Sequence, residues 1–131
     1  MAGGDSLHPP DWRESAAKHW HRIDVMLADG DAEAAAFFLQ QSLEKYLKGY
    51  LLVRGWALRK IHQLQTLLND AIRNDRSLEP YRDRCERVSG YYFVERYLQL
   101  VRSGLTAADI EADRTEARQL VLALFPDGSL P

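Results

Sequence analysis

The sequence contains a single cysteine, Cys85, among its 131 residues. An internal disulfide and a metal site built from several cysteines are therefore excluded. Cys85 falls on an apolar helical stripe, where a lone cysteine usually serves as a small core residue. A chain without a disulfide framework is compatible with a reducing compartment, and we expect a cytoplasmic protein.

Long apolar runs and an excess of one charge are also missing. No stretch approaches the roughly 18 consecutive apolar residues of a membrane span, and residues 1–10 lack the apolar segment of a secretory signal. We therefore expect no membrane segment. Lys and Arg number 17 against 19 Asp and Glu, a formal net charge of -2. This balance does not indicate a strongly electrostatic RNA-binding protein, although it leaves RNA binding through a local basic patch open.

Motifs that carry chemistry at a fixed spacing are absent as well. The sequence has neither G-x-x-x-x-G-K nor G-x-G-x-x-G, so it has no glycine-rich phosphate loop of these types. His19 and His21 lie two residues apart, whereas a helical metal site uses histidines four apart. We expect no metal site and no resident cofactor. Three acidic residues near the C-terminus are expected on a solvated helix face: Glu111, Asp113 and Glu116.

Apolar residues recur instead at steps of three and four, the spacing of amphipathic helices. We expect a loose tail over residues 1–10, followed by a helix that begins at a capping box of Asp11 and Glu14 and ends at Gly30. The second helix follows directly. It carries Gly49 in its interior, and a close helix–helix contact would explain that residue despite its low helix propensity.

The second half of the chain predicts three more helices. A short one covers residues 61–71, another has Pro80 in its first turn, and the last begins at a capping box opened by Thr106. No strand alternation is visible. The sequence therefore predicts an all-α, up-and-down antiparallel bundle of four main helices and one short helix over residues 11–125, with a C-terminal tail over 126–131.

Several segments resemble, in the same order, the motifs of one family of helical domains. Residues 40–49 (QQSLEKYLKG) resemble the QQ-x-x-EK-x-LK-[AG] motif of HEPN domains, with aromatic residues at 37–38 before it. Gly55 and residues 62–64 (HQL) match the family's G…H-x-L segment, and residues 91–97 (YYFVERY) are similar to its YY-x-x-x-RY-P element. One departure is Leu98, which stands where the family usually has proline and would let a helix continue past the arginine.

The resemblance implies a small helical bundle that often forms a homodimer. It also implies a partner, since prokaryotic HEPN domains are often encoded beside a minimal nucleotidyltransferase, as a two-component or toxin–antitoxin pair. A catalytic subgroup of the family cleaves RNA with an Arg-x4–6-His motif on a late helix. In this sequence no histidine follows His62, so we expect no ribonuclease activity of that kind. Arg13 and His19 have the spacing, but they lie on the first helix, and we interpret that match as chance.

Basic side chains suggest where an anion would bind. Lys45 and Lys48 on the second helix, with Arg96, could converge on the phosphate of ATP or another nucleotide, because lysine supplies a point charge and arginine a planar fork. The alternative is an exposed polar strip in which Glu44 and Lys48 form an ordinary i, i+4 pair. His62 has two interpretations as well: it binds phosphate near the end of the bundle, or it orients the turn into the third helix.

Aromatic residues cluster in the late part of the chain. Tyr91, Tyr92 and Tyr97, with Phe93 between them, are expected to form the interface with a second copy of the chain, because amphipathic rings supply much of the contact energy at interfaces. Packing in the core and stacking on bases are the alternatives.

Three functions follow from these features. The first is a HEPN-like module that binds a nucleotidyltransferase-domain protein and a nucleotide, with the chemistry left to the partner. The second is an atypical ribonuclease toxin that uses Arg96 with a tyrosine or with His62. The third is a structural or regulatory oligomer without a small ligand.

Overall fold

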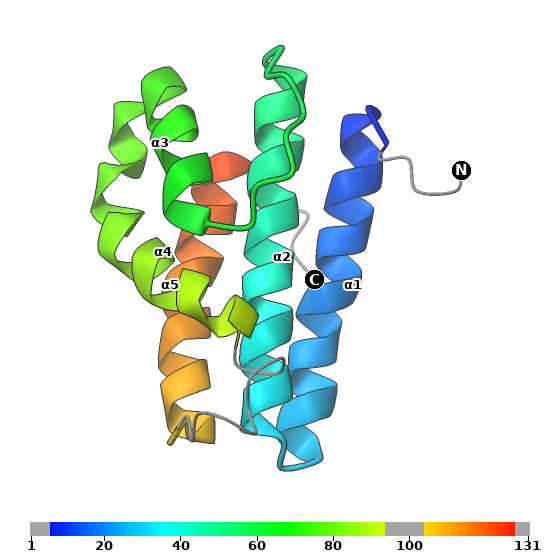
Figure 1. The fold of residues 1–131 in the computed structure, drawn as a ribbon, viewed down its shortest axis with the longest axis vertical. Coiled ribbons are helices and arrows are strands. Elements are labelled where there is room, and N and C mark those ends of the chain that lie inside the picture. Colours follow the sequence, from blue (N-terminus) through cyan, green and yellow to red (C-terminus); the bar gives the residue numbers. More distant parts are fainter. Residues whose placement is uncertain (1–5, 94–103, 128–131) are drawn as a thin grey trace.

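The computed structural model of the protein describes residues 6–93 and 104–127. This part contains no strand and forms an all-α bundle (Figure 1). In Figure 1, α1 runs downward and α2 upward; after the loop, α3 runs upward and α4 downward, and α5 runs upward. The elements are α1 (Pro9–Ala28), α2 (Ala32–Val53), α3 (Leu64–Asn74), the 3-10 helix η1 (Arg76–Tyr81), α4 (Arg82–Ser89), the 3-10 helix η2 (Gly90–Phe93) and α5 (Ala107–Leu124).

Helix ends lie where short-range sequence features place them. Gly30 has a φ of 77°, which glycine adopts at no steric cost, and it closes α1. The Asp31 side chain accepts a hydrogen bond from the backbone N–H of Ala34 and so caps α2. At α5, Thr106 and Asp109 form the expected capping box.

The start of α1 differs from the expected one. The helix begins at Pro9, and its N-cap residue, His8, makes no side-chain capping bond. The capping box of Asp11 and Glu14 was therefore a wrong prediction; the Asp11 carboxylate instead accepts a hydrogen bond from Ser6 Oγ at 2.6 Å. The helix starts earlier because Pro9 and Pro10 favour its first turn. The φ of proline is already helical, and a first-turn N–H would have no acceptor within the helix, so its absence costs nothing.

The segment between α3 and the end of η2 is divided into more short helices than the sequence predicted. Pro80 lies inside η1 rather than in the first turn of α4, which begins only at Arg82. Proline lacks the N–H that an α-helix interior requires, so the α-helix starts beyond it. α4 ends at Ser89, and the chain continues as η2.

Helix α2 is central and contacts α1, α3 and α5 (Figure 1). Gly49 lies close to the start of α1, because an added Cβ there would be 3.3 Å from the Trp12 Cβ and 3.5 Å from the Pro9 carbonyl oxygen. This close approach accounts for the helix-interior glycine. The largest fully buried side chains of the core include Trp20, Ile23, Leu39, Leu43, Tyr46, Leu47, Leu64, Leu68 and Ile110.

The expected role of Cys85 as a core residue holds. Cys85 is buried, and burial raises the pKa of its thiol to about 12, so it is a packing residue rather than a nucleophile. Within the described residues, none of the helices combines the length and the apolar character that a membrane crossing needs.

Candidate functional site

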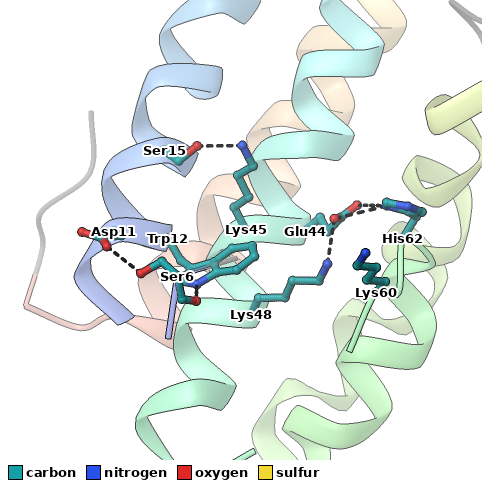
Figure 2. A pocket seen from close by; sticks show the side chains of 9 residues that line it. All are labelled: Ser6, Asp11, Trp12, Ser15, Glu44, Lys45, Lys48, Lys60 and His62. Carbon is teal, nitrogen blue, oxygen red and sulfur yellow. Dashed lines mark hydrogen bonds and ion pairs between the residues drawn. The ribbon is translucent and has the colours of Figure 1, made fainter. Parts of the chain in front are cut away.

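A pocket of about 380 Å³ opens between the first half of α1, the middle of α2 and the loop that leads to α3 (Figure 2). This volume lies within the usual range of small-molecule sites. The pocket brings together Lys45, Lys48 and His62, three residues that the sequence had suggested for anion binding. Its lining is Ser6, Asp11, Trp12, Ser15, Glu44, Lys45, Lys48, Lys60 and His62.

Glu44 and Lys48 form a buried ion pair at one wall of the pocket. The distance from Lys48 Nζ to Glu44 Oε2 is 3.0 Å, and the Lys48 and Glu44 side chains are 5% and 6% exposed. The interpretation of these residues as an exposed polar strip was therefore wrong, because α1 and the loop before α3 cover this face of α2. Gln40 supports the pair from the core side, with its Nε2 donating to Glu44 Oε1 at 3.1 Å and to the His62 carbonyl oxygen at 2.8 Å.

Lys45 lies in a different environment. Its Nζ is 2.7 Å from Ser15 Oγ and 2.7 Å from His19 Nε2, both on α1. Burial lowers the pKa of Lys45, and the neighbouring Arg22 and Lys48 lower it further, although Glu44 acts in the opposite direction. Burial, followed by the charges of Lys45 and Arg22, lowers the pKa of His19 to about 4, so this ring is neutral at pH 7 and accepts the hydrogen bond.

The contacts of His62 fit the orienting role that was considered for it, whereas its binding of phosphate stays a prediction. Its Nδ1 is 3.2 Å from Glu44 Oε1, and its ring stacks on Tyr92 with centroids 4.4 Å apart, so it orients the loop before α3. Its side chain is nevertheless 48% exposed and lines the pocket, where it is accessible to a ligand.

A family model described as the HEPN domain matches residues 10–123. The chain belongs to the HEPN domain family. Its fold is similar to the crystal structure of TT1696 from Thermus thermophilus, with a TM-score of 0.79 and 25% sequence identity over 91% of this chain and 97% of that one. No curated protein matches the sequence.

The HEPN motif over residues 40–49 thus supplies both core and pocket. Gln40, Leu43 and Leu47 are buried, whereas Glu44, Lys45 and Lys48 line the pocket. A single helical segment can do both because residues three and four apart share a face.

Lys60 was missed in the sequence. It lies in the loop between α2 and α3 and lines the pocket beside His62 (Figure 2). No spacing rule links a loop lysine to a helix, so only its position two residues before His62 could have pointed to it. Arg96, the fourth residue considered for the anion, lies outside the described residues, as does Tyr97.

The tyrosines considered for an interface have different environments. Tyr91 is 6% exposed and its hydroxyl donates to Asp113, so it packs inside the chain. Tyr92 is partly exposed and stacks between His62 and Phe37. Its place at an interface stays a prediction.

Asp113 forms a second buried polar cluster, on α5. It is fully buried and accepts hydrogen bonds from Arg84, Arg87 and Tyr91. The expectation that Asp113 lies on a solvated face was therefore wrong, since α4 and η2 cover it. Burial and the bond to Asp113 raise the pKa of Tyr91. Each partner is satisfied within the cluster, which indicates a structural role.

Chemically, the pocket suits an anion more than a metal. Three lysines line it against two carboxylates, Glu44 and Asp11. Among residues 6–93 and 104–127, no group of three or more His, Cys, Asp or Glu side chains could hold a metal ion.

Proposed function

We propose that this HEPN protein is a binding module that holds the phosphates of a nucleotide in the lysine-lined pocket and acts with a minimal nucleotidyltransferase partner. The observation that carries the proposal is the convergence of Lys45, Lys48, Lys60 and His62 on one pocket of about 380 Å³. Ammonium groups bind phosphate oxygens through short, charge-assisted hydrogen bonds.

The pocket is arranged so that binding costs little reorganisation. Glu44 already holds Lys48 and His62 in place, and Ser15 holds Lys45. The Trp12 ring lies beside these groups, with Lys48 Nζ 5.5 Å from its centroid, and it gives the pocket an apolar wall. Preorganised side chains lose less conformational entropy when a ligand binds.

The partner is part of the proposal because we expect no catalytic arrangement of the family's kind on the late helices. Histidine is absent after His62, so the Arg-x4–6-His pattern has no second member on a late helix. We propose that the nucleotidyltransferase carries the chemistry and that the HEPN module is a homodimer with Tyr92 near its interface.

Calorimetric titration with ATP tests nucleotide binding. We expect Lys60→Ala to weaken binding by about ten- to a hundredfold, because a hydrogen bond to a charged group contributes about 1.5–3 kcal/mol. Lys60 is exposed, so the substitution should leave the fold intact. Lys18→Ala is the matched control, since Lys18 is 65% exposed and lies outside the pocket. Absence of binding at millimolar ATP would contradict the proposal.

Light scattering on the same sample tests the dimer, and co-purification with a minimal nucleotidyltransferase tests the partner. A Tyr92→Ala variant should shift the dimer towards monomer. A monomer at every concentration, or a nucleotidyltransferase that elutes separately, would count against the corresponding part of the proposal.

A further inference from the structure

Lysine is scarce in this chain and is concentrated in the pocket. Lys and Arg together number 17, yet the only lysines are Lys18, Lys45, Lys48 and Lys60. Three of these four line the pocket, and no arginine does so among the described residues. Lysine differs from arginine in that its amine can lose its proton and then act as a nucleophile.

The three pocket lysines are not equivalent. Lys48 forms an ion pair with the buried Glu44 carboxylate, with Nζ 3.0 Å from Oε2. Lys45 has no carboxylate at ion-pair distance in the described part of the chain; its hydrogen-bond partners are the neutral side chains of Ser15 and His19. Figure 2 shows the amine of Lys45 directed at Ser15 on α1, while the amines of Lys48 and Lys60 lie on the side of His62.

The neighbours of Lys45 suit its neutral form. Lys45 is half-buried, and His19 and Arg22 face it from α1 while Glu44 and Lys48 flank it on α2. Of these, Arg22 and Lys48 repel its ammonium form and Glu44 attracts it. The Ser15 hydroxyl accepts a hydrogen bond from the ammonium form and can turn to donate one to the neutral amine.

We propose that Lys45 is a reactive amine that forms an imine with a small carbonyl compound whose phosphate group is held by Lys48 and Lys60. This activity goes beyond the proposed nucleotide binding and does not require it, although both use one pocket. Lys48 and Lys60 supply the charge that attracts the phosphate, and Lys45 supplies the electron pair.

The reaction is a balanced condensation. The electron pair of neutral Lys45 Nζ forms a bond to the carbonyl carbon, and the C=O π pair moves to the oxygen, which takes up a proton from solvent. The nitrogen then loses both of its protons, one to the hydroxyl, which leaves as water, and one to solvent, and a C=N bond remains. No oxidant or reductant is consumed.

Labelling of the folded protein with pyridoxal 5′-phosphate, followed by borohydride reduction and peptide mass spectrometry, tests this inference. Lys18, exposed on α1, is the internal reference. We expect pyridoxal 5′-phosphate to label Lys45 several-fold faster than Lys18. Lys48 and Lys60 hold the phosphate beside Lys45, and a lowered pKa raises the neutral fraction of its amine. Pyridoxal, which has the aldehyde but no phosphate, should lose the part of this preference that the bound phosphate provides, and should label Lys45 more slowly than its phosphate does.

Two variants separate reactivity from folding. Lys45→Arg keeps the charge but removes the amine, so labelling at this site should disappear while circular dichroism stays unchanged. Ser15→Asp places a carboxylate beside Lys45, which should hold the ammonium form and slow labelling at pH 7.

Equal labelling of Lys18 and Lys45, or labelling of Lys48 or Lys60 first, would overturn the inference. So would equal rates with pyridoxal and its phosphate. An ATP titration without binding leaves these results untouched, so the two proposals fail separately.

Discussion

Two carboxylates of this HEPN domain are buried together with the side chains that donate hydrogen bonds to them. Asp113 and Glu44 each lie below the surface, and each accepts hydrogen bonds from more than one side chain. Burial of a carboxylate costs free energy unless hydrogen-bond donors replace the lost water. Removing the carboxylate or its donors therefore leaves a buried polar group without a partner.

Asp113→Ala provides a test at this scale. The change leaves the buried Tyr91 hydroxyl and the inner faces of Arg84 and Arg87 without their acceptor. We expect a loss of about 2–3 kcal/mol in the free energy of unfolding. This is less than the loss for a fully buried ion pair, because both arginine side chains are partly exposed. Urea denaturation measures it. Glu116→Ala, on the exposed face of the same helix, should change stability by less than about 0.5 kcal/mol, and an equal loss in both variants would refute the assignment.

At the scale of elements, the helix ends are set by local hydrogen bonds. In the capping box of α5, Asp109 N–H donates to Thr106 Oγ1 at 3.2 Å, and Thr106 N–H donates to Asp109 Oδ2 at 3.0 Å. These bonds give acceptors to two backbone N–H groups at the start of the helix. No preceding helical turn exists there to supply a carbonyl acceptor.

Thr106→Ala should therefore destabilise the protein by about 1 kcal/mol, the usual cost of losing an N-cap. Thr115→Ala is a matched control within α5, because Thr115 is exposed and its hydroxyl donates to the Glu111 carbonyl oxygen of the preceding turn rather than capping the helix. Chemical denaturation compares the two variants. An equal loss in the free energy of unfolding in both variants would show that the capping bonds of Thr106 add no stability beyond that of an ordinary threonine in the helix.

At the scale of the whole molecule, packing of α1 on α2 makes stability depend on pH. His19 is held between Lys45 and the Phe38 ring, with the His19 and Phe38 ring centroids 5.6 Å apart, and its pKa falls from 6.5 to about 4 on folding. Between these two values the unfolded state binds more protons than the folded state. The contribution of His19 is therefore complete above pH 6.5 and is lost as the pH falls towards 4.

We expect this histidine to account for about 1–2 kcal/mol of lost stability between about pH 7 and pH 4.5, after allowance for solvent screening of a half-exposed ring. Urea midpoints measured across this range check the slope. His19→Gln keeps a hydrogen-bond acceptor but cannot be protonated, so it should flatten the pH dependence relative to the parent. An unchanged slope in His19→Gln would assign the pH dependence to other groups.

The helical class and several helix boundaries were determined by the sequence alone. Gly30, Asp31 and Thr106 act through bonds and dihedral angles within about four residues, so their effect does not depend on the rest of the fold. The HEPN motif over residues 40–49 was also visible, and it pointed to the family and to two lysines of the pocket.

Only the tertiary structure decided what is buried and what meets in the pocket. Asp113 and Glu44 looked solvent-exposed, because periodicity within one helix does not show which neighbour covers a polar face. Lys60 joins Lys45 and Lys48 across a loop, and His19 meets Lys45 across 26 residues of chain. Such contacts depend on how the helices pack against one another, and no local pattern encodes that.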